Sequence, residues 1–89
     1  MLIALIARDK PAALQTRLDT RDAHVEYLKE TGVVSQAGPL LDDAGQMIGS
    51  LVILDVADMQ AAQDWAAGDP YATAGLFANV ELIPWKKVI

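Results

Sequence analysis

The sequence contains no cysteine and only one histidine, His24. Without thiols the chain has no disulfide and no cysteine nucleophile, and one imidazole without thiolates does not form the usual transition-metal sites. Basic residues are also scarce, because 7 lysines and arginines stand against 12 aspartates and glutamates, for a formal net charge of -5. Nucleic acids and anionic membranes attract basic surfaces, so the composition disfavours both as partners.

Long hydrophobic runs and ligand-binding motifs are missing as well. Residues 1–7 are apolar but too few to cross a bilayer, and they lack the basic lead-in of a signal peptide, so we expect a cytoplasmic protein. The 6 glycines do not have the spacing of a phosphate-binding loop, and neither a calcium-binding loop nor a nucleophile elbow is present. We therefore expect no metal and no cofactor.

The apolar fraction, by contrast, is large for a chain of this size. The sequence has 89 residues, of which 53% are hydrophobic and 21% charged, and this length predicts a single domain over residues 1–89. A domain this small buries a modest share of its surface, so the excess of apolar residues favours a buried interface between two copies. The alternative is a compact monomer with a well-filled core.

Apolar spacing predicts a strand and then a long helix at the start of the chain. Residues 2–7 form a continuous apolar run, which is typical of a strand covered on both faces. Pro11 is placed to open a helix over residues 12–30, and Gly32 to end it. Four apolar residues of this helix are spaced to share one buried stripe: Leu14, Leu18, Val25 and Leu28.

Three further strands are expected. Residues 33–41 and 47–54 flank the turn-forming residues 42–45, and this arrangement predicts a hairpin. Residues 76–83 form the last strand, which Pro84 either ends or places at a sheet edge.

Capping residues indicate a second helical region between the hairpin and the last strand. Asp58 is a candidate N-cap for a helix that Gly68 closes, and Asp69 with Pro70 begins a short helical turn that ends at Gly75. The resulting order is β-α-β-β-α-β, which predicts an α+β domain of the ferredoxin-like type, with an antiparallel sheet and the helices on one face.

The predicted strands are apolar on both parities. A sheet face that meets water shows polar residues at alternate positions, and this alternation is missing from residues 2–7 and 51–54. We therefore expect an apolar cover on the face without helices, and a second subunit is the simplest one.

His24 is the first candidate for chemistry. On a helical wheel it shares a narrow arc with Arg17, Arg21 and Leu28, at the border of the apolar stripe. An imidazole, with an unperturbed pKa of about 6.5, can accept and donate a proton near neutral pH, and two nearby arginines can hold an anionic substrate. The alternative is a half-buried structural histidine, with the arginines paired to acids such as Asp22.

Asp69, Ser50 and Arg8 are further candidates. A carboxylate can fix the tautomer of an imidazole and stabilise its charged form, but helix capping alone also explains Asp69, and its spacing does not show that it reaches His24. Ser50 offers a hydroxyl to a ligand or is a plain strand residue beside a bend. Arg8 either points towards a pocket or marks the exit of the first strand to solvent.

Taken in order, these residues resemble the YciI-like, or YCII-related, family almost from end to end. Each matching piece is weak alone, and Asp69-Pro70-Tyr71 is the most specific of them. The pieces are Arg8-Asp9-Lys10-Pro11 after the apolar first strand, Arg21-Asp22-Ala23-His24-Val25-Glu26-Tyr27-Leu28, Gly32, Ala37-Gly38-Pro39-Leu40, Gly45, Gly49-Ser50, Asp69-Pro70-Tyr71 and Ala74-Gly75-Leu76-Phe77.

The resemblance implies a ferredoxin-like domain that pairs with a second copy, sheet against sheet, as a dimeric α+β barrel. It also implies an active-site pair at His24 and Asp69; a dehydrochlorinase of the wider family uses such a pair on a chlorinated hydroxyhydroquinone without any cofactor. We therefore expect a cofactor-independent, isomerase-like or lyase-like enzyme that acts on a small anionic, cyclic or aromatic metabolite. The residues expected to bind that substrate are Arg8, Arg17, Arg21, Ser50 and Tyr71.

Two alternatives stay open at this point. A non-catalytic module that binds a small ligand or another protein needs the same pocket but no reactive histidine. A monooxygenase like other proteins of similar fold is supported by the fold alone, which is a weak guide to function. Contact between His24 and Asp69 beside a cleft favours the enzyme, whereas separation of the two residues favours the module.

Overall fold

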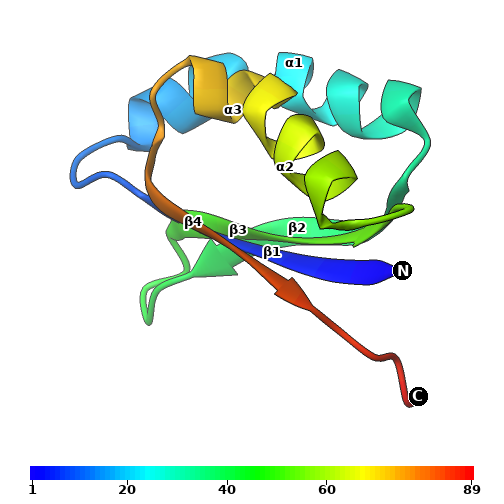
Figure 1. Ribbon diagram of the computed structural model, residues 1–89. Coiled ribbons are helices and arrows are strands. Elements are labelled where there is room, and N and C mark those ends of the chain that lie inside the picture. Colours follow the sequence, from blue (N-terminus) through cyan, green and yellow to red (C-terminus); the bar gives the residue numbers. More distant parts are fainter.

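The computed structural model describes all 89 residues and has two layers, a four-stranded sheet and three helices that lie together on one of its faces (Figure 1). The sheet is antiparallel, with the strand order β2-β3-β1-β4. This arrangement confirms the expected ferredoxin-like α+β fold. The elements are β1 (Leu2–Asp9), α1 (Leu14–Thr31), β2 (Val34–Leu41), β3 (Met47–Asp55), α2 (Met59–Gly68), α3 (Pro70–Thr73) and β4 (Phe77–Pro84).

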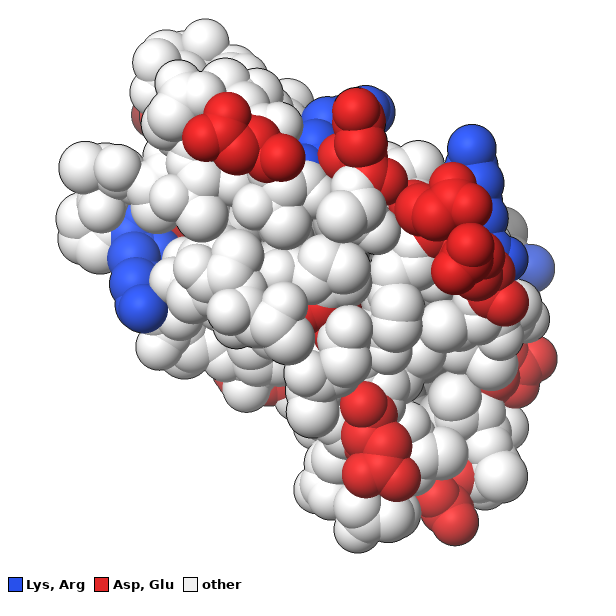
Figure 2. Space-filling model, turned by 90° about the horizontal axis from the view of Figure 1, so that it is seen from above, with Lys and Arg blue, Asp and Glu red and all other residues white.

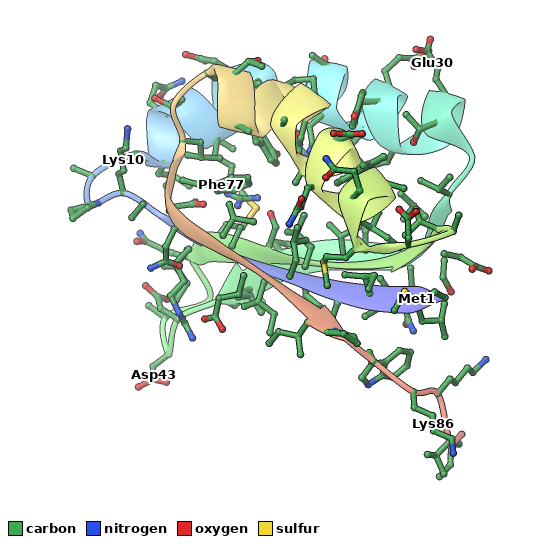
Figure 3. All side chains as sticks on the ribbon, in the orientation of Figure 1. Met1, Lys10, Glu30, Asp43, Phe77 and Lys86 are labelled. Atoms are coloured by element: carbon green, nitrogen blue, oxygen red, sulfur yellow. The ribbon has the colours of Figure 1, made fainter.

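The core lies between the sheet and the helices. Alternation along β1 turns Ile3, Leu5 and Ala7 towards the helices, and all three are at most 1% exposed. Register then places Leu54, Val52 and Ser50 of β3 beside them on the same face. Side chains fill the space between the two layers, and among them Phe77 points under the helices (Figure 3).

Helix α1 differs from its prediction in two ways. Pro11 does not open it; the chain makes a turn there, with Ala12 at a φ of +58°, and the helix begins only at Leu14. The predicted apolar stripe is wrong at Leu18, which is 47% exposed, whereas Leu14, Val25 and Leu28 are half-buried. The residues that α1 buries are Arg17 and His24, whose polar atoms find partners on other elements.

The capping residues act largely as predicted. Asp58 caps α2 by accepting a hydrogen bond from the Ala61 amide at 2.8 Å, and Gly32 ends α1 in the left-handed region. Gly68 belongs to the last turn of α2 rather than closing it. Asp69 follows directly and caps α3, because its Oδ1 accepts a hydrogen bond from the Tyr71 amide at 3.0 Å.

No element covers the second face of the sheet, and residues 85–89 run away from the domain (Figure 1). Apolar side chains of three strands lie on this open face. Leu51 and Ile83 remain 39% and 43% exposed there. None of the three helices is long and apolar enough to span a membrane.

Candidate functional site

His24 and Asp69 meet beneath the helices. His24 Nδ1 lies 2.7 Å from Asp69 Oδ1, and the two residues are 6% and 1% exposed. The same carboxylate oxygen caps α3, and the cap holds it towards α1. On sequence alone, helix capping and contact with His24 are alternative roles of Asp69. In the structure a single oxygen, Oδ1, has both roles.

The protonation of the imidazole follows from this contact. An ionised carboxylate only accepts hydrogen bonds, so Nδ1 carries a hydrogen and donates a hydrogen bond to Asp69. Nε2 then holds the lone pair. It has no hydrogen-bond partner in the chain. Because every fully buried side-chain nitrogen and oxygen of the protein has such a partner, Nε2 is in contact with solvent.

Tyr71 joins His24 to Arg17 through a stack of three planar groups. The rings of His24 and Tyr71 are parallel within 16°, with their centroids 3.8 Å apart. The Arg17 guanidinium carbon lies 4.6 Å from the Tyr71 centroid. Arg17 and His24 are seven positions apart on α1, which corresponds to about 10.5 Å along the helix axis. Because the Tyr71 ring contacts both side chains, it lies between them.

Arg17 is held from below by Asp9 and Ser50. Its Nε and Nη2 donate to the two Asp9 carboxylate oxygens at 2.7 and 2.9 Å, and Nη2 also donates to Ser50 Oγ at 2.9 Å. The pairing of Arg17 with Asp22, which the sequence left open, does not occur. Arg17 is only 2% exposed, so a buried, bidentate ion pair anchors this end of the stack.

Asp9 is the site residue that the sequence analysis missed. The sequence shows it only as one of the residues that follow the apolar first strand. The available signal was strand parity, because the alternation that turns Ile3, Leu5 and Ala7 towards the helices continues to Asp9.

Burial and charge set the protonation of Arg17 and Tyr71. Burial lowers the pKa of Arg17, but the hydrogen bond and charge of Asp9, aided by Tyr71, outweigh it, so the pKa is raised overall. Burial raises the pKa of Tyr71, and the charges of Arg17 and Arg21 offset only part of that rise. At neutral pH the guanidinium is therefore charged and the phenol protonated.

A cavity of about 220 Å³ opens beside this network, between α1 and the strands β2 and β3. Five predicted site residues line it: Arg17, Arg21, His24, Ser50 and Tyr71. Its apolar wall comes from α1, β2 and β3 and includes Val25, Leu28, Pro39, Met47 and Val52. The cavity therefore combines an apolar wall with the polar side chains of Arg21, His24 and Tyr71.

Arg8 is the predicted binding residue that the structure does not bring to the cavity. Its side chain is exposed and shares the parity of Ala4 and Ile6, which face away from the helices. Arg21, in contrast, is exposed at the edge of the cavity and forms no ion pair within the chain.

Most charged groups on the helix-covered side are acidic, and the basic ones lie towards its margins (Figure 2).

Comparison with known proteins places this architecture in a family. Residues 1–86 match the YCII-related domain. The chain belongs to the YCII-related family. It is 39% identical to an uncharacterised protein of Haemophilus influenzae and 38% identical to the protein YciI of Escherichia coli O6:H1, in both cases over 97 aligned positions that cover 99% of each chain.

Solved structures show the same fold. The 5-chloro-2-hydroxyhydroquinone dehydrochlorinase TftG of Burkholderia phenoliruptrix, in complex with 2,5-dihydroxybenzoquinone, is 32% identical with a TM-score of 0.88, over 97% of this chain and 94% of that one. An antibiotic biosynthesis monooxygenase has a TM-score of 0.58 at 16% identity, over 98% of this chain and 100% of that one. At that identity the likeness shows the fold alone.

Proposed function

We propose that this protein is a cofactor-independent enzyme in which His24, oriented by Asp69, moves a proton on a small, anionic, cyclic or aromatic metabolite. The observation that carries the proposal is the buried Nδ1–Oδ1 contact of 2.7 Å, which leaves Nε2 open beside a cavity. A histidine with one nitrogen held by a carboxylate and the other free is arranged for general acid–base catalysis.

The reaction class follows from a single mobile proton. Nε2 takes a proton from a carbon acid, and the electron pair of the broken C–H bond forms a new double bond. In an isomerisation an existing double bond of the substrate shifts its electron pair to another atom, and the imidazolium returns the proton to that atom. In an elimination a leaving group departs with its bonding electrons, and the imidazolium then releases the proton to water. Asp69 stabilises the imidazolium between these steps.

The structural relative supports a ring-shaped substrate. TftG is a dehydrochlorinase, and its complex contains a substituted quinone ring. The cavity of about 220 Å³ exceeds the roughly 150 Å³ of an engineered apolar cavity that binds benzene. Elimination from a substituted six-membered ring is therefore the first reaction to screen.

The test is turnover of a panel of chlorinated and hydroxylated cyclic acids and quinones by the wild type, His24→Ala and Asp69→Asn. We expect His24→Ala to lower kcat by roughly 10²- to 10⁴-fold, the usual contribution of a general acid–base group. Asp69→Asn should also slow turnover, because it leaves the imidazole without its carboxylate. Circular dichroism spectra and the molar mass of each variant in solution, compared with those of the wild type, control for loss of folding.

Full turnover by a folded His24→Ala variant would contradict the mechanism. Binding of panel compounds without any turnover in the wild type would favour the non-catalytic, ligand-binding alternative. In that case the same cavity serves recognition only, and His24 acts as a polar contact.

We also propose that the protein is a homodimer whose subunits pack through the open face of the sheet. The centre of this face is apolar, and polar residues surround it, which is the composition of an interface. A second copy would remove from water the apolar side chains that the helices leave uncovered. The residues concerned are the exposed Leu51 and Ile83 and the half-buried Leu2 and Ile6, whereas Ala4 and Ile53 of the same face are already buried within the chain.

A further inference from the structure

The two arginines that line the cavity differ in what they already bind. Arg17 is 2% exposed, and its guanidinium is taken up by Asp9 and Ser50. Arg21, one helical turn further along α1, is exposed and makes no hydrogen bond or ion pair within the chain. The sequence presents the two residues alike, but the structure leaves only one of them available to a ligand.

Charge compensation around the cavity leads to the same distinction. Asp9, at 2.7 Å, neutralises Arg17, and Asp69 is satisfied by His24 and by the Tyr71 amide. Arg21 is therefore the one uncompensated full charge at this cavity. A second anionic group on a ligand would find no free cation among the residues that line the cavity.

Helix geometry relates Arg21 to the reacting nitrogen. Residues three apart on a helix are neighbours on one face, so Arg21 and His24 flank the same part of the cavity. A carboxylate held bidentately by Arg21 would place the attached ring against Val25 and Val52, within one helical turn of His24.

We propose that Arg21 is the specificity-determining residue of this site and selects a ring-shaped substrate that carries one negative charge. Arg17 is then a positioning residue, which holds Tyr71 against His24 rather than binding the substrate. The inference rests on the proposed function, because it names the substrate class of the same cavity.

The experiment uses three unreactive probes of similar shape, which are benzoate, neutral benzamide and dianionic phthalate. Backbone amide shifts of the full chain are followed by NMR as each probe is added at constant ionic strength. The proteins are the wild type, Arg21→Gln and Lys29→Gln. Lys29 lies on the same helix but outside the cavity. Lys29→Gln removes one positive charge, as Arg21→Gln does, so the two variants have the same net charge.

We expect benzoate to bind the wild type about tenfold more tightly than benzamide, because a charged hydrogen-bonded pair replaces a neutral contact. Phthalate should bind no more tightly than benzoate. Arg21→Gln should lose the preference for benzoate while keeping its affinity for benzamide, and Lys29→Gln should keep the preference. A purely structural role for Arg21 would instead change the affinities of both probes together.

Equal affinities of benzoate and benzamide for the wild type, or a preference that survives in Arg21→Gln, would overturn the inference. So would tighter binding of phthalate, or the absence of cavity shifts with every probe. None of these outcomes involves proton transfer, so turnover by the His24 variants still decides the proposed function separately.

Discussion

The two sides of the one sheet differ in the polar and apolar groups that they hold. The side under the helices contains the apolar core, yet two carboxylates, a guanidinium and an imidazole are also buried there, in two hydrogen-bonded pairs that both contact the Tyr71 ring. The open face is exposed, yet its centre is apolar. The comparison teaches that the covered side buries charged groups, at a cost in stability that apolar contacts elsewhere must offset.

The largest effect is expected from Asp9→Ala on the covered face. The change leaves the buried guanidinium of Arg17 without its carboxylate, and breaking a buried pair in this way costs about 3–5 kcal/mol of unfolding free energy. Urea denaturation at one fixed protein concentration measures it. Asp22→Ala removes an exposed acid from helix α1 and should change the free energy by less than about 0.5 kcal/mol.

A double variant separates the lost partner from lost packing. Asp9→Leu with Arg17→Met replaces the pair by apolar groups and should recover part of the stability that Asp9→Ala loses. If Asp22→Ala proved as destabilising as Asp9→Ala, the covered face would not depend on the Asp9–Arg17 pair.

The next effect concerns the open face. Leu51→Glu places one carboxylate per subunit in the apolar centre of the proposed interface, and we expect the dissociation constant of the dimer to rise by roughly 10²-fold or more. Sedimentation velocity over a concentration series measures this. Gln63→Glu adds the same charge on the helical side and should leave the association unchanged. A wild type that stays monomeric at every concentration would refute the pairing of these faces.

A smaller effect of pH belongs again to the covered side. Both tyrosines of the chain, Tyr27 and Tyr71, have pKa values raised above 10.0, chiefly by burial, and the charge of Asp69 raises both as well. The folded chain thus holds these protons more tightly than the unfolded chain does. Stability from this source is complete below pH 10 and is lost as the pH rises through the folded-state pKa values.

Denaturation at increasing alkaline pH tests this point, with tyrosinate absorbance as the direct reading of ionisation. The double variant Tyr27→Phe, Tyr71→Phe should lose less free energy of unfolding between neutral and alkaline pH than the wild type. Lysine and arginine titrate in both proteins, so the difference isolates the phenols. An equal loss in the two proteins would show that the tyrosines contribute nothing to the pH dependence.

The two faces also differ in how well the sequence predicted them. Strand periodicity, the hairpin turn and the caps at Asp58 and Asp69 report local preferences, and the fold follows from them. The helical arc of Arg17, Arg21 and His24 did predict three residues that line one cavity. Spacing could not predict contacts between distant elements, such as Asp9 with Arg17, because those depend on how the helices settle on the sheet.

The buried face of α1 shows the physical reason for the main error. An apolar stripe is expected to face the core, and Leu18 was placed there with Leu14. In the structure the charged and aromatic partners of Arg17 and His24 turn the polar arc inward instead, and Leu18 is left 47% exposed. Periodicity weighs each residue by its own hydrophobicity and takes no account of a partner from another element.

The smallest effect is expected from Arg8→Gln on the open face. Arg8 was predicted to bind substrate, but its side chain lies on the side of the sheet opposite the cavity. We therefore expect KM and the affinity for benzoate to change by no more than about twofold, the range of an ordinary surface substitution. Arg21→Gln, measured in parallel, should raise KM for an anionic substrate clearly more. A rise of similar size in Arg8→Gln would mean that charge reaches the cavity across the subunit interface, and the two faces would then form one functional unit.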